Sequence, residues 1–180
     1  MGFEPVKRRG SYWEDVKKID EVIKDFPFHT TGKCEKDFEN GFSTALMAMQ
    51  SDFENEVITQ IDKTRKVKSV FCFGKNNRPD LTISKDGIAF EIKYFSNSSD
   101  GFNEAIGQGY LYRLQYKFVF IILVIGEKKK DLYYNIAEGK EKNMEDILYH
   151  LSKEMNIFTY IVPAFEIKKP GTSKCLTFFK

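Results

Sequence analysis

The sequence predicts a mixed α/β fold in which helices flank a central β-sheet. Apolar residues recur every three or four positions through much of the N-terminal third, as they do in amphipathic helices. Shorter apolar runs at 67–73, 80–84 and 87–95 are typical of consecutive strands. The run FVFIILVI at 118–125 is typical of a central strand that is covered on both faces.

The N-terminal part is expected to be helical, with one helix over 11–26 and further helix from Glu35. The apolar spacing after Glu35 fits either one helix that ends near residue 63 or two helices that separate near Ser51. The β-branched residues of EVITQI leave a strand over 56–61 as an alternative.

The remaining elements complete an α/β order. After the three strands we expect a helix over 102–115, a strand over 116–125 and a helix near 141–155. Runs at 157–167 and 175–179 read as closing strands. No repeat or linker composition interrupts the chain, so a single domain over residues 1–180 is expected.

Composition excludes several classes of protein. The net charge of +2, with 42% hydrophobic and 30% charged residues, is ordinary for a soluble globular protein. The 3 cysteines lie far apart and the chain has only 2 histidines, which disfavours a zinc site or a disulfide framework. The start lacks an apolar signal core, and no apolar run approaches the roughly 20 residues that span a bilayer. We therefore expect a soluble, cytoplasmic protein without a membrane partner.

The stretch RPDLTISKDGIAFEIKYF, 78–95, predicts a β-hairpin, because Asp86-Gly87 between apolar runs is a strong turn signal. A two-residue turn places Leu81 opposite Ile92 and Ile83 opposite Phe90 in one apolar layer. The same register pairs Asp80 with Lys93 and Thr82 with Glu91 on the other face. A four-residue turn keeps this choice of faces, whereas a three-residue turn would break it.

Asp80, Glu91 and Lys93 are thus expected to converge. Two carboxylates at this separation form a hard oxygen site suited to Mg²⁺ or Mn²⁺. A nearby lysine can stabilise charge on a phosphate or help to position an attacking water. The plainer interpretation is a cross-strand ion pair of Asp80 and Lys93, worth about 0.2–1 kcal/mol, with Glu91 in solvent.

The tripeptide Glu-x-Lys alone means little, because it also begins at Glu127, Glu138 and Glu166. Of these copies, only Glu166 also lies in an apolar strand pattern, and no Pro-Asp strand precedes it. The copy at Glu91 has the partner strand, the register and a basic segment before it, and this combination is far more specific.

Pro79-Asp80 followed by Glu91-x-Lys93 resembles the PD-(D/E)XK nuclease superfamily, which has a restriction endonuclease-like fold. The match covers roughly residues 50–125, with the order αβββαβ as the core and the N-terminal helix and C-terminal strands as additions. The resemblance implies that Asp80, Glu91 and the carbonyl of Ile92 bind Mg²⁺ or Mn²⁺ and that Lys93 is the catalytic lysine.

Gln108 and Tyr112 lie four positions apart and share one face of the predicted helix. They resemble the Q-x-x-x-Y element of the RecB-like branch of this superfamily. The resemblance implies that these side chains orient the lysine or contact the DNA backbone. The alternative is a half-buried tyrosine beside a surface glutamine.

Many members of this family also carry a glutamate on the first core helix. A strand over 67–73 spans about 20 Å, and a helix covers that distance in about 13 residues. A helix that ends near residue 63 then favours Glu54 as the third metal carboxylate. If the helix stops near Gln50 and EVITQI is a strand, Glu39 is the candidate instead.

The segment from Lys63 to Arg78 holds six basic residues and no acidic one. It reads either as a solvated face or as a surface that contacts a nucleic-acid backbone. The residues expected to bind nucleic acid are Lys66, Lys68, Lys75 and Arg78.

The leading hypothesis is a metal-dependent deoxyribonuclease. The alternative is a catalytically silent nuclease fold that binds DNA or a protein. An RNA endonuclease of the viral cap-snatching kind, with His29 as an added metal ligand, ranks lower because Gln108 and Tyr112 are not part of that pattern. Many relatives act as homodimers, which leaves a dimer as an open expectation.

Overall fold

The computed structural model describes residues 6–61, 66–96 and 101–179. Its centre is a 6-stranded sheet in the order β1-β4-β5-β6-β7-β8, and β2 and β3 form a separate 2-stranded sheet. The strands are β1 (Val57–Thr59), β2 (Val70–Cys72), β3 (Lys75–Asn77), β4 (Leu81–Ile83), β5 (Ile88–Phe95), β6 (Phe118–Ile125), β7 (Ile157–Pro163) and β8 (Leu176–Thr177). The α-helices are α1 (Ser11–Asp25), α2 (Phe28–Thr31), α3 (Glu35–Ala48), α4 (Gly101–Tyr112), α5 (Lys130–Ala137) and α6 (Lys142–Met155), and two short 3₁₀ helices are η1 (Gln50–Asp52) and η2 (Glu127–Lys129).

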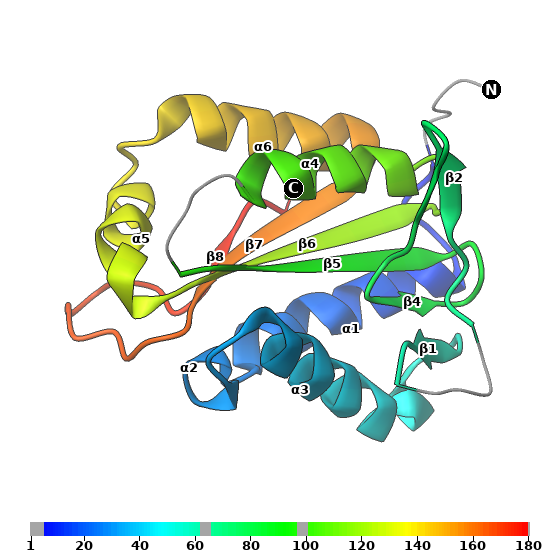
Figure 1. Cartoon of the computed structure of the whole chain (residues 1–180), viewed down its shortest axis with the longest axis horizontal. Coiled ribbons are helices and arrows are strands. Elements are labelled where there is room, and N and C mark those ends of the chain that lie inside the picture. Colours follow the sequence, from blue (N-terminus) through cyan, green and yellow to red (C-terminus); the bar gives the residue numbers. More distant parts are fainter. Residues whose placement is uncertain (1–5, 62–65, 97–100, 180) are drawn as a thin grey trace.

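Helices cover both faces of the sheet (Figure 1). The apolar sides of α1 and α3 pack on the face that presents Phe90 and Ile92 of β5. The opposite face, which presents Ile121 and Leu123 of β6, packs against α4, α5 and α6. Every residue of β6 is buried, which explains its unbroken apolar sequence. The predicted α/β class with a mixed sheet flanked by helices is confirmed.

The pairing of β4 with β5 differs from the predicted register by two residues. Leu81 lies opposite Phe90 and Ile83 opposite Ile88, so the turn contains four residues, from Ser84 to Gly87. Ser84 adopts a left-handed conformation with φ 59, and its N–H donates to the Glu56 carbonyl at 2.8 Å. The predicted choice of faces is preserved, because the shift is an even number.

The helix before the sheet is shorter than one of the two predicted alternatives. α3 ends at Ala48, and Val57–Thr59 forms the edge strand β1, antiparallel to β4. The long helix to residue 63 and the second helix after Ser51 are therefore both wrong, since only the 3₁₀ turn η1 follows α3 before β1, and the strand alternative for EVITQI is confirmed.

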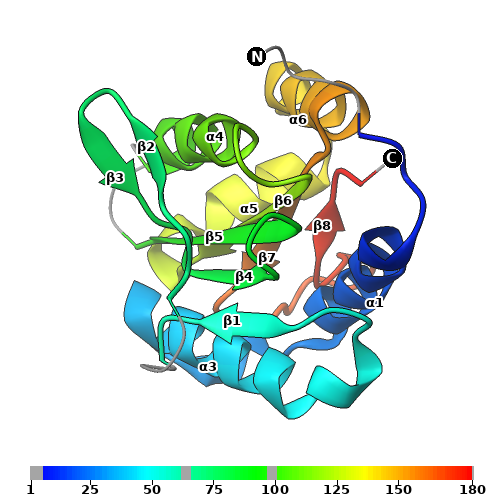
Figure 2. The same ribbon diagram turned by 90° about the vertical axis from the view of Figure 1, so that its right-hand side faces the viewer.

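The predicted strand over 67–73 is only partly formed and does not join the central sheet. Val70–Cys72 pairs with Lys75–Asn77 through a tight turn, and this hairpin lies beside α4 (Figure 2). The strand next to β4 in the central sheet is β1.

The connection that prepares the site is the crossover from β5 to β6. These two strands pair in parallel from Ile88↔Phe118 to Phe95↔Ile125, and α4 connects them across one face. The predicted strand 87–95 and the helices near 102–115 and 141–155 are confirmed within a few residues at their ends. Within the described ranges, no helix is both long and apolar enough to cross a membrane.

Candidate metal centre

The candidate site lies where β5 extends beyond β4. β4 begins at Leu81, opposite Phe90, so its ladder does not reach the last residues of β5. Beyond this point, side chains instead of a neighbouring strand accept hydrogen bonds from the backbone of β5. The Ile92 N–H donates to Asp80 Oδ2 at 2.7 Å, and the Tyr94 N–H donates to a Glu35 oxygen at 3.0 Å. Because the N–H and C=O of a strand residue point to the same side, the Ile92 carbonyl also points to this edge.

Glu91 points to the face of the sheet that α4 covers. One carboxylate oxygen accepts a hydrogen bond from the Tyr112 hydroxyl at 2.7 Å. The other lies 2.9 Å from the Lys93 ammonium. Glu91 is only 2% exposed, so both of its oxygens are held by protein groups in a nearly dry environment.

Lys93 is surrounded by carboxylates. Besides Glu91, its ammonium lies 3.5 Å from an oxygen of Glu35 and 3.6 Å from one of Glu104. Burial alone would lower the pKa of Lys93, but the charge and hydrogen bond of Glu91, and the charges of Glu35 and Glu104, raise it above its ordinary value. Lys93 is therefore a protonated donor at neutral pH.

Asp80 is half-buried and Glu91 is buried, and each carboxylate disfavours the charge of the other. Burial, followed by the charges of Glu91 and Glu39, raises the pKa of Asp80 to about 8, although the Ile92 N–H and the Lys93 charge act the other way. Burial also raises the pKa of Glu91, against the opposing effects of Lys93 and Tyr112. Perturbed carboxylates of this kind are characteristic of functional sites.

The structure brings Glu39, not Glu54, next to Asp80. Glu39 lies on α3, and its charge raises the Asp80 pKa. Glu54 is exposed after η1, where its N–H donates to Asp15 Oδ1 at 2.8 Å. The choice of Glu54 depended on the long helix, and the alternative stated for a helix that stops near Gln50 fits the structure.

Sequence reasoning missed two acidic residues that contact Lys93, which are Glu35 and Glu104. Glu35 lies one helical turn before Glu39 and thus shares its face of α3, so a correct helix end would have indicated both. Glu104 lies in the first turn of the helix that carries Tyr112, and no sequence pattern distinguishes it from other exposed glutamates.

The Q-x-x-x-Y element divides into two roles. Tyr112 is fully buried and bonds Glu91 directly. Gln108 lies one turn earlier on α4, and its side-chain oxygen is buried without a hydrogen-bond partner in the described part of the chain. A buried amide oxygen without a partner is costly, so a ligand or a water molecule bound here would satisfy it.

A glutamine that the sequence did not indicate ties the Pro-Asp segment to β1. Gln60 Nε2 donates to the Pro79 carbonyl at 2.9 Å, and Gln60 Oε1 accepts from Arg78 at 3.0 Å. Gln60 follows β1 directly. The contact holds the backbone in position one residue before Asp80.

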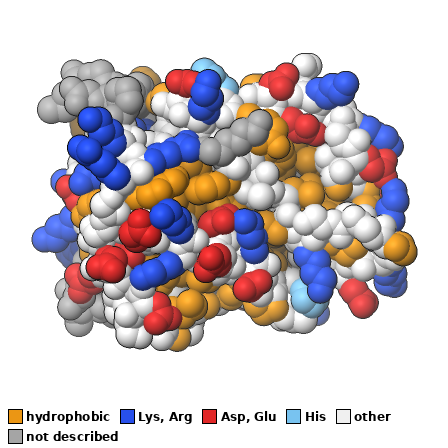
Figure 3. Space-filling model, turned by 180° about the vertical axis from the view of Figure 1, so that it is seen from behind, with side chains coloured by type: hydrophobic (Ala, Val, Ile, Leu, Met, Phe, Trp, Pro, Cys, Tyr) orange, Lys and Arg blue, Asp and Glu red, His pale blue; other side chains and the backbone are white. Residues whose placement is uncertain are grey.

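The predicted basic residues gather on the hairpin of β2 and β3 and its flanks. Lys66, Lys68, Lys75 and Arg78 are all exposed, while Lys63 and Arg65 lie outside the described residues. By contrast, the face seen from behind in Figure 3 carries positive and negative side chains interspersed. The hairpin is therefore a distinctly basic feature.

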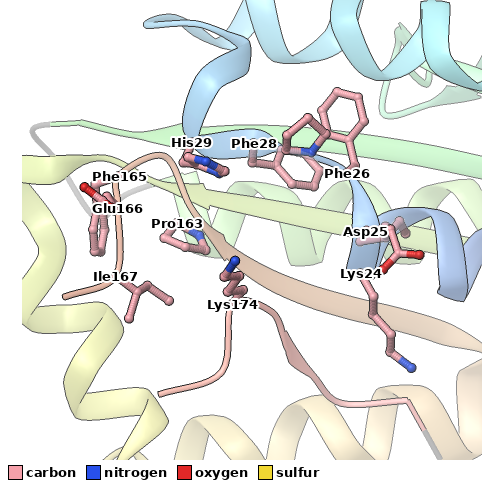
Figure 4. A pocket seen from close by; sticks show the side chains of 12 residues that line it. Lys24, Asp25, Phe26, Phe28, His29, Pro163, Phe165, Glu166, Ile167 and Lys174 are labelled. Carbon is pink, nitrogen blue, oxygen red and sulfur yellow. The ribbon is translucent and has the colours of Figure 1, made fainter. Parts of the chain in front are cut away.

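The competing Glu166-x-Lys168 tripeptide has no comparable surroundings. Residues 166–168 form a loop after β7, and Glu166 and His29 line the hollow of about 270 Å³ shown in Figure 4. His29 therefore belongs to a different pocket from Asp80 and Glu91, which removes the argument for His29 as a ligand beside them.

The donors at the sheet edge fit a hard divalent cation. They are the carboxylates of Asp80 and Glu91 and the carbonyl of Ile92, and a bound cation would relieve the repulsion that raises the pKa of Asp80. In the described residues no three His, Cys, Asp or Glu side chains come close enough to hold a metal by themselves. Magnesium commonly keeps several water ligands and needs only one or two protein carboxylates.

Comparisons of the chain with protein-family models, curated protein sequences and solved structures find no match.

Proposed function

We propose that the chain is a Mg²⁺- or Mn²⁺-dependent nuclease of the PD-(D/E)XK type that hydrolyses phosphodiester bonds in DNA. The observation that carries the proposal is the convergence of Asp80, Glu91 and Lys93 at one sheet edge, next to the Ile92 carbonyl. The order α3, β1, β4, β5, α4, β6 supports a restriction endonuclease-like core, with the β2–β3 hairpin inserted between its first two strands.

Asp80, Glu91 and the Ile92 carbonyl would hold the cation. A bound divalent cation polarises the phosphodiester and lowers the pKa of a bound water. Glu39 lies close enough for its charge to act on Asp80, and it adds negative charge that favours cation binding. Because Glu91 is buried, bulk water does not compete with the bound phosphate for the groups around this carboxylate.

Lys93 acts as a positively charged hydrogen-bond donor, because its pKa is raised and it stays protonated at neutral pH. It is positioned to donate to a non-bridging phosphate oxygen or to orient the attacking water. The water oxygen bonds to phosphorus while the ester bond to the leaving sugar oxygen breaks; the water gives up a proton to solvent, and the leaving oxygen takes one from solvent. Because Lys93 is already protonated, it stabilises charge on the phosphate rather than taking the proton.

Tyr112 and Gln108 act as positioning residues on α4. The Tyr112 hydroxyl fixes one oxygen of Glu91 and leaves the other toward Lys93. The Gln108 amide oxygen, one turn away, is available to a water molecule or an incoming donor. Tyr112 thus orients Glu91 directly, and Gln108 offers its oxygen beside it on the same helix.

The test is metal-dependent cleavage of linear, circular and branched DNA. Glu91→Gln keeps the acceptor for Tyr112, and Lys93→Met keeps the apolar stem, so both variants should fold. We expect each to lose about 100-fold or more in cleavage rate, as when a preorganised charged or hydrogen-bonding group is removed. Glu166→Gln and Lys168→Met change the same tripeptide in an exposed loop and should keep full activity.

Cleavage that persists in both site variants would contradict the assignment. Wild-type protein that binds DNA but does not cleave it with Mg²⁺ or Mn²⁺ would instead show a catalytically silent nuclease fold.

A further inference from the structure

The hairpin of β2 and β3 ends in two exposed phenylalanines. Phe71 is 71% exposed and Phe73 is 90% exposed, the highest values among the large hydrophobic side chains of the described residues. Leaving an aromatic ring in water forgoes the stabilisation that burial provides. Two such rings at one tip make this the most apolar projection described on the molecule's surface.

The turn that presents Phe73 is unfavourable for this residue. Phe73 and Gly74 connect Cys72 to Lys75 and have φ values of 52 and 72. Two-residue turns of this kind favour Asn or Gly at both positions, because a bulky side chain is strained at positive φ. Local folding and solubility therefore both argue against a phenylalanine here, and binding of a ligand is the remaining reason.

The base of the hairpin is held firmly on the body of the protein. Val70 is 6% exposed and belongs to the core on the α4 side of the sheet. The Tyr116 hydroxyl donates to the Lys68 carbonyl at 2.6 Å. Figure 2 shows the hairpin beside α4, on the side of the molecule where β4 and β5 lie. The tip thus has a defined position relative to the site.

The charge around the tip fits a polyanion. Lys66 and Lys68 precede the two rings, Lys75 and Arg78 follow them, and no acidic residue occurs between 66 and 78. Basic side chains that follow a backbone, interleaved with exposed aromatic rings on which bases stack, are characteristic of single-stranded nucleic-acid binding. Contact with the phosphates of a closed duplex would use the basic residues but not the rings.

The tip is also close enough to the candidate metal centre for one nucleic-acid strand to contact both. Asp80 lies seven positions after Phe73 in the chain, which limits their distance to about 25 Å. The Gln60 bond to the Pro79 carbonyl fixes the end of this connection. A strand that places one phosphate at Lys93 can therefore reach the tip within several nucleotides.

We propose that the hairpin stacks unpaired bases of the nucleic-acid substrate on Phe73 and Phe71, so that the protein prefers single-stranded or branched DNA to continuous duplex. The inference rests on the proposed function, because it assumes that the substrate is nucleic acid.

The test is binding in EDTA, where no cleavage occurs, of labelled single-stranded DNA and of the matching duplex. Phe73→Asn removes the ring and suits the turn. It should weaken single-strand binding about fivefold or more while leaving thermal stability equal or higher. Phe73→Tyr keeps an aromatic ring and should bind like the wild type. Ile147→Asn changes an exposed apolar residue on α6, away from the hairpin, and should leave binding unchanged. Fluorescence of a 2-aminopurine base should be quenched by wild type and less so by Phe73→Asn.

Equal affinity and equal quenching for wild type and Phe73→Asn would overturn the proposal. A dimer that Phe73→Asn converts to monomer in light scattering would also overturn it, because the tip would then be a protein contact. Glu91→Gln separates this inference from the nuclease assignment, because it changes the proposed catalytic carboxylate and leaves both rings in place. Ring-dependent binding without any cleavage by wild type refutes only the nuclease, whereas cleavage with ring-independent binding refutes only the stacking role.

Discussion

Replacing Asp80 with asparagine is expected to stabilise the metal-free protein at neutral pH. Burial and the charges of Glu91 and Glu39 raise the pKa of Asp80 from 3.8 to about 8. The folded protein then holds a proton that the unfolded chain has already released. The contribution of protonated Asp80 to stability is therefore fully present below about pH 4 and is lost as the pH rises through about 8. Asparagine keeps an oxygen that can accept the Ile92 N–H but carries no charge.

The size of the expected stabilisation follows from the pKa shift of Asp80. One pKa unit corresponds to about 1.4 kcal/mol, so the penalty at pH 7 has an upper limit of roughly 4 kcal/mol. Relaxation and water penetration reduce such penalties, and we expect a gain of about 1–3 kcal/mol for Asp80→Asn. Urea unfolding in EDTA at several pH values measures it, with Trp13, the single tryptophan, as the fluorescent probe.

The pH dependence is more informative than the gain itself. The wild-type free energy of unfolding should fall as the pH rises, while Asp80→Asn should show a flatter profile. Asp146→Asn removes an exposed carboxylate from α6 and should follow the wild type. Manganese should cancel or reverse this difference, since saturation at 100 times the dissociation constant adds about 2.7 kcal/mol to the wild type alone. Parallel pH profiles, or an asparagine variant that is less stable throughout, would refute the reasoning.

Three further outcomes test separate parts of the site. Tyr112→Phe should destabilise the protein by about 1–3 kcal/mol in denaturant unfolding and weaken manganese binding, because one oxygen of Glu91 loses its donor. Glu39→Gln should weaken manganese binding in calorimetry and Glu54→Gln should not; equal effects would contradict the assignment of the helix carboxylate. Lys75→Ala should reduce the salt slope of log K for single-stranded DNA by about 0.7, and an unchanged slope would remove Lys75 from the interface.

The hairpin that carries the site could be predicted because its signals are local. Alternation of apolar and polar residues determines which face each side chain takes, and Asp86-Gly87 marks the turn. An error of two residues in register leaves the faces unchanged. For this reason Asp80 and Glu91 were predicted to meet, although the partner assigned to Asp80 was wrong.

The end of α3 could not be predicted, because it depends on contacts distant in sequence. Asp15 of α1 accepts the backbone N–H groups of Glu54 and Asn55 at 2.8 and 3.1 Å. The Gln50 side chain accepts the N–H of Val57 at 2.7 Å. These acceptors stabilise a turn where the apolar spacing alone is equally compatible with a helix. Because the end of α3 was not predicted, the sequence could not decide between Glu39 and Glu54.

The register of β4 against β5 decides what the charged residues do. In the predicted register, Asp80 faces Lys93, and the two form a cross-strand ion pair that needs no ligand. In the observed register, the ladder ends where Leu81 faces Phe90, and Lys93 projects past the start of β4. The Asp80 N–H donates to the Phe90 carbonyl at 3.0 Å, and the Asp80 carboxylate comes close enough to Glu91 for their charges to repel. A half-buried and a buried carboxylate are then close together, and the nearby ammonium of Lys93 is shared with Glu35 and Glu104. A cation that binds this edge removes an existing repulsion, which is why the four-residue turn favours a metal site over a structural ion pair.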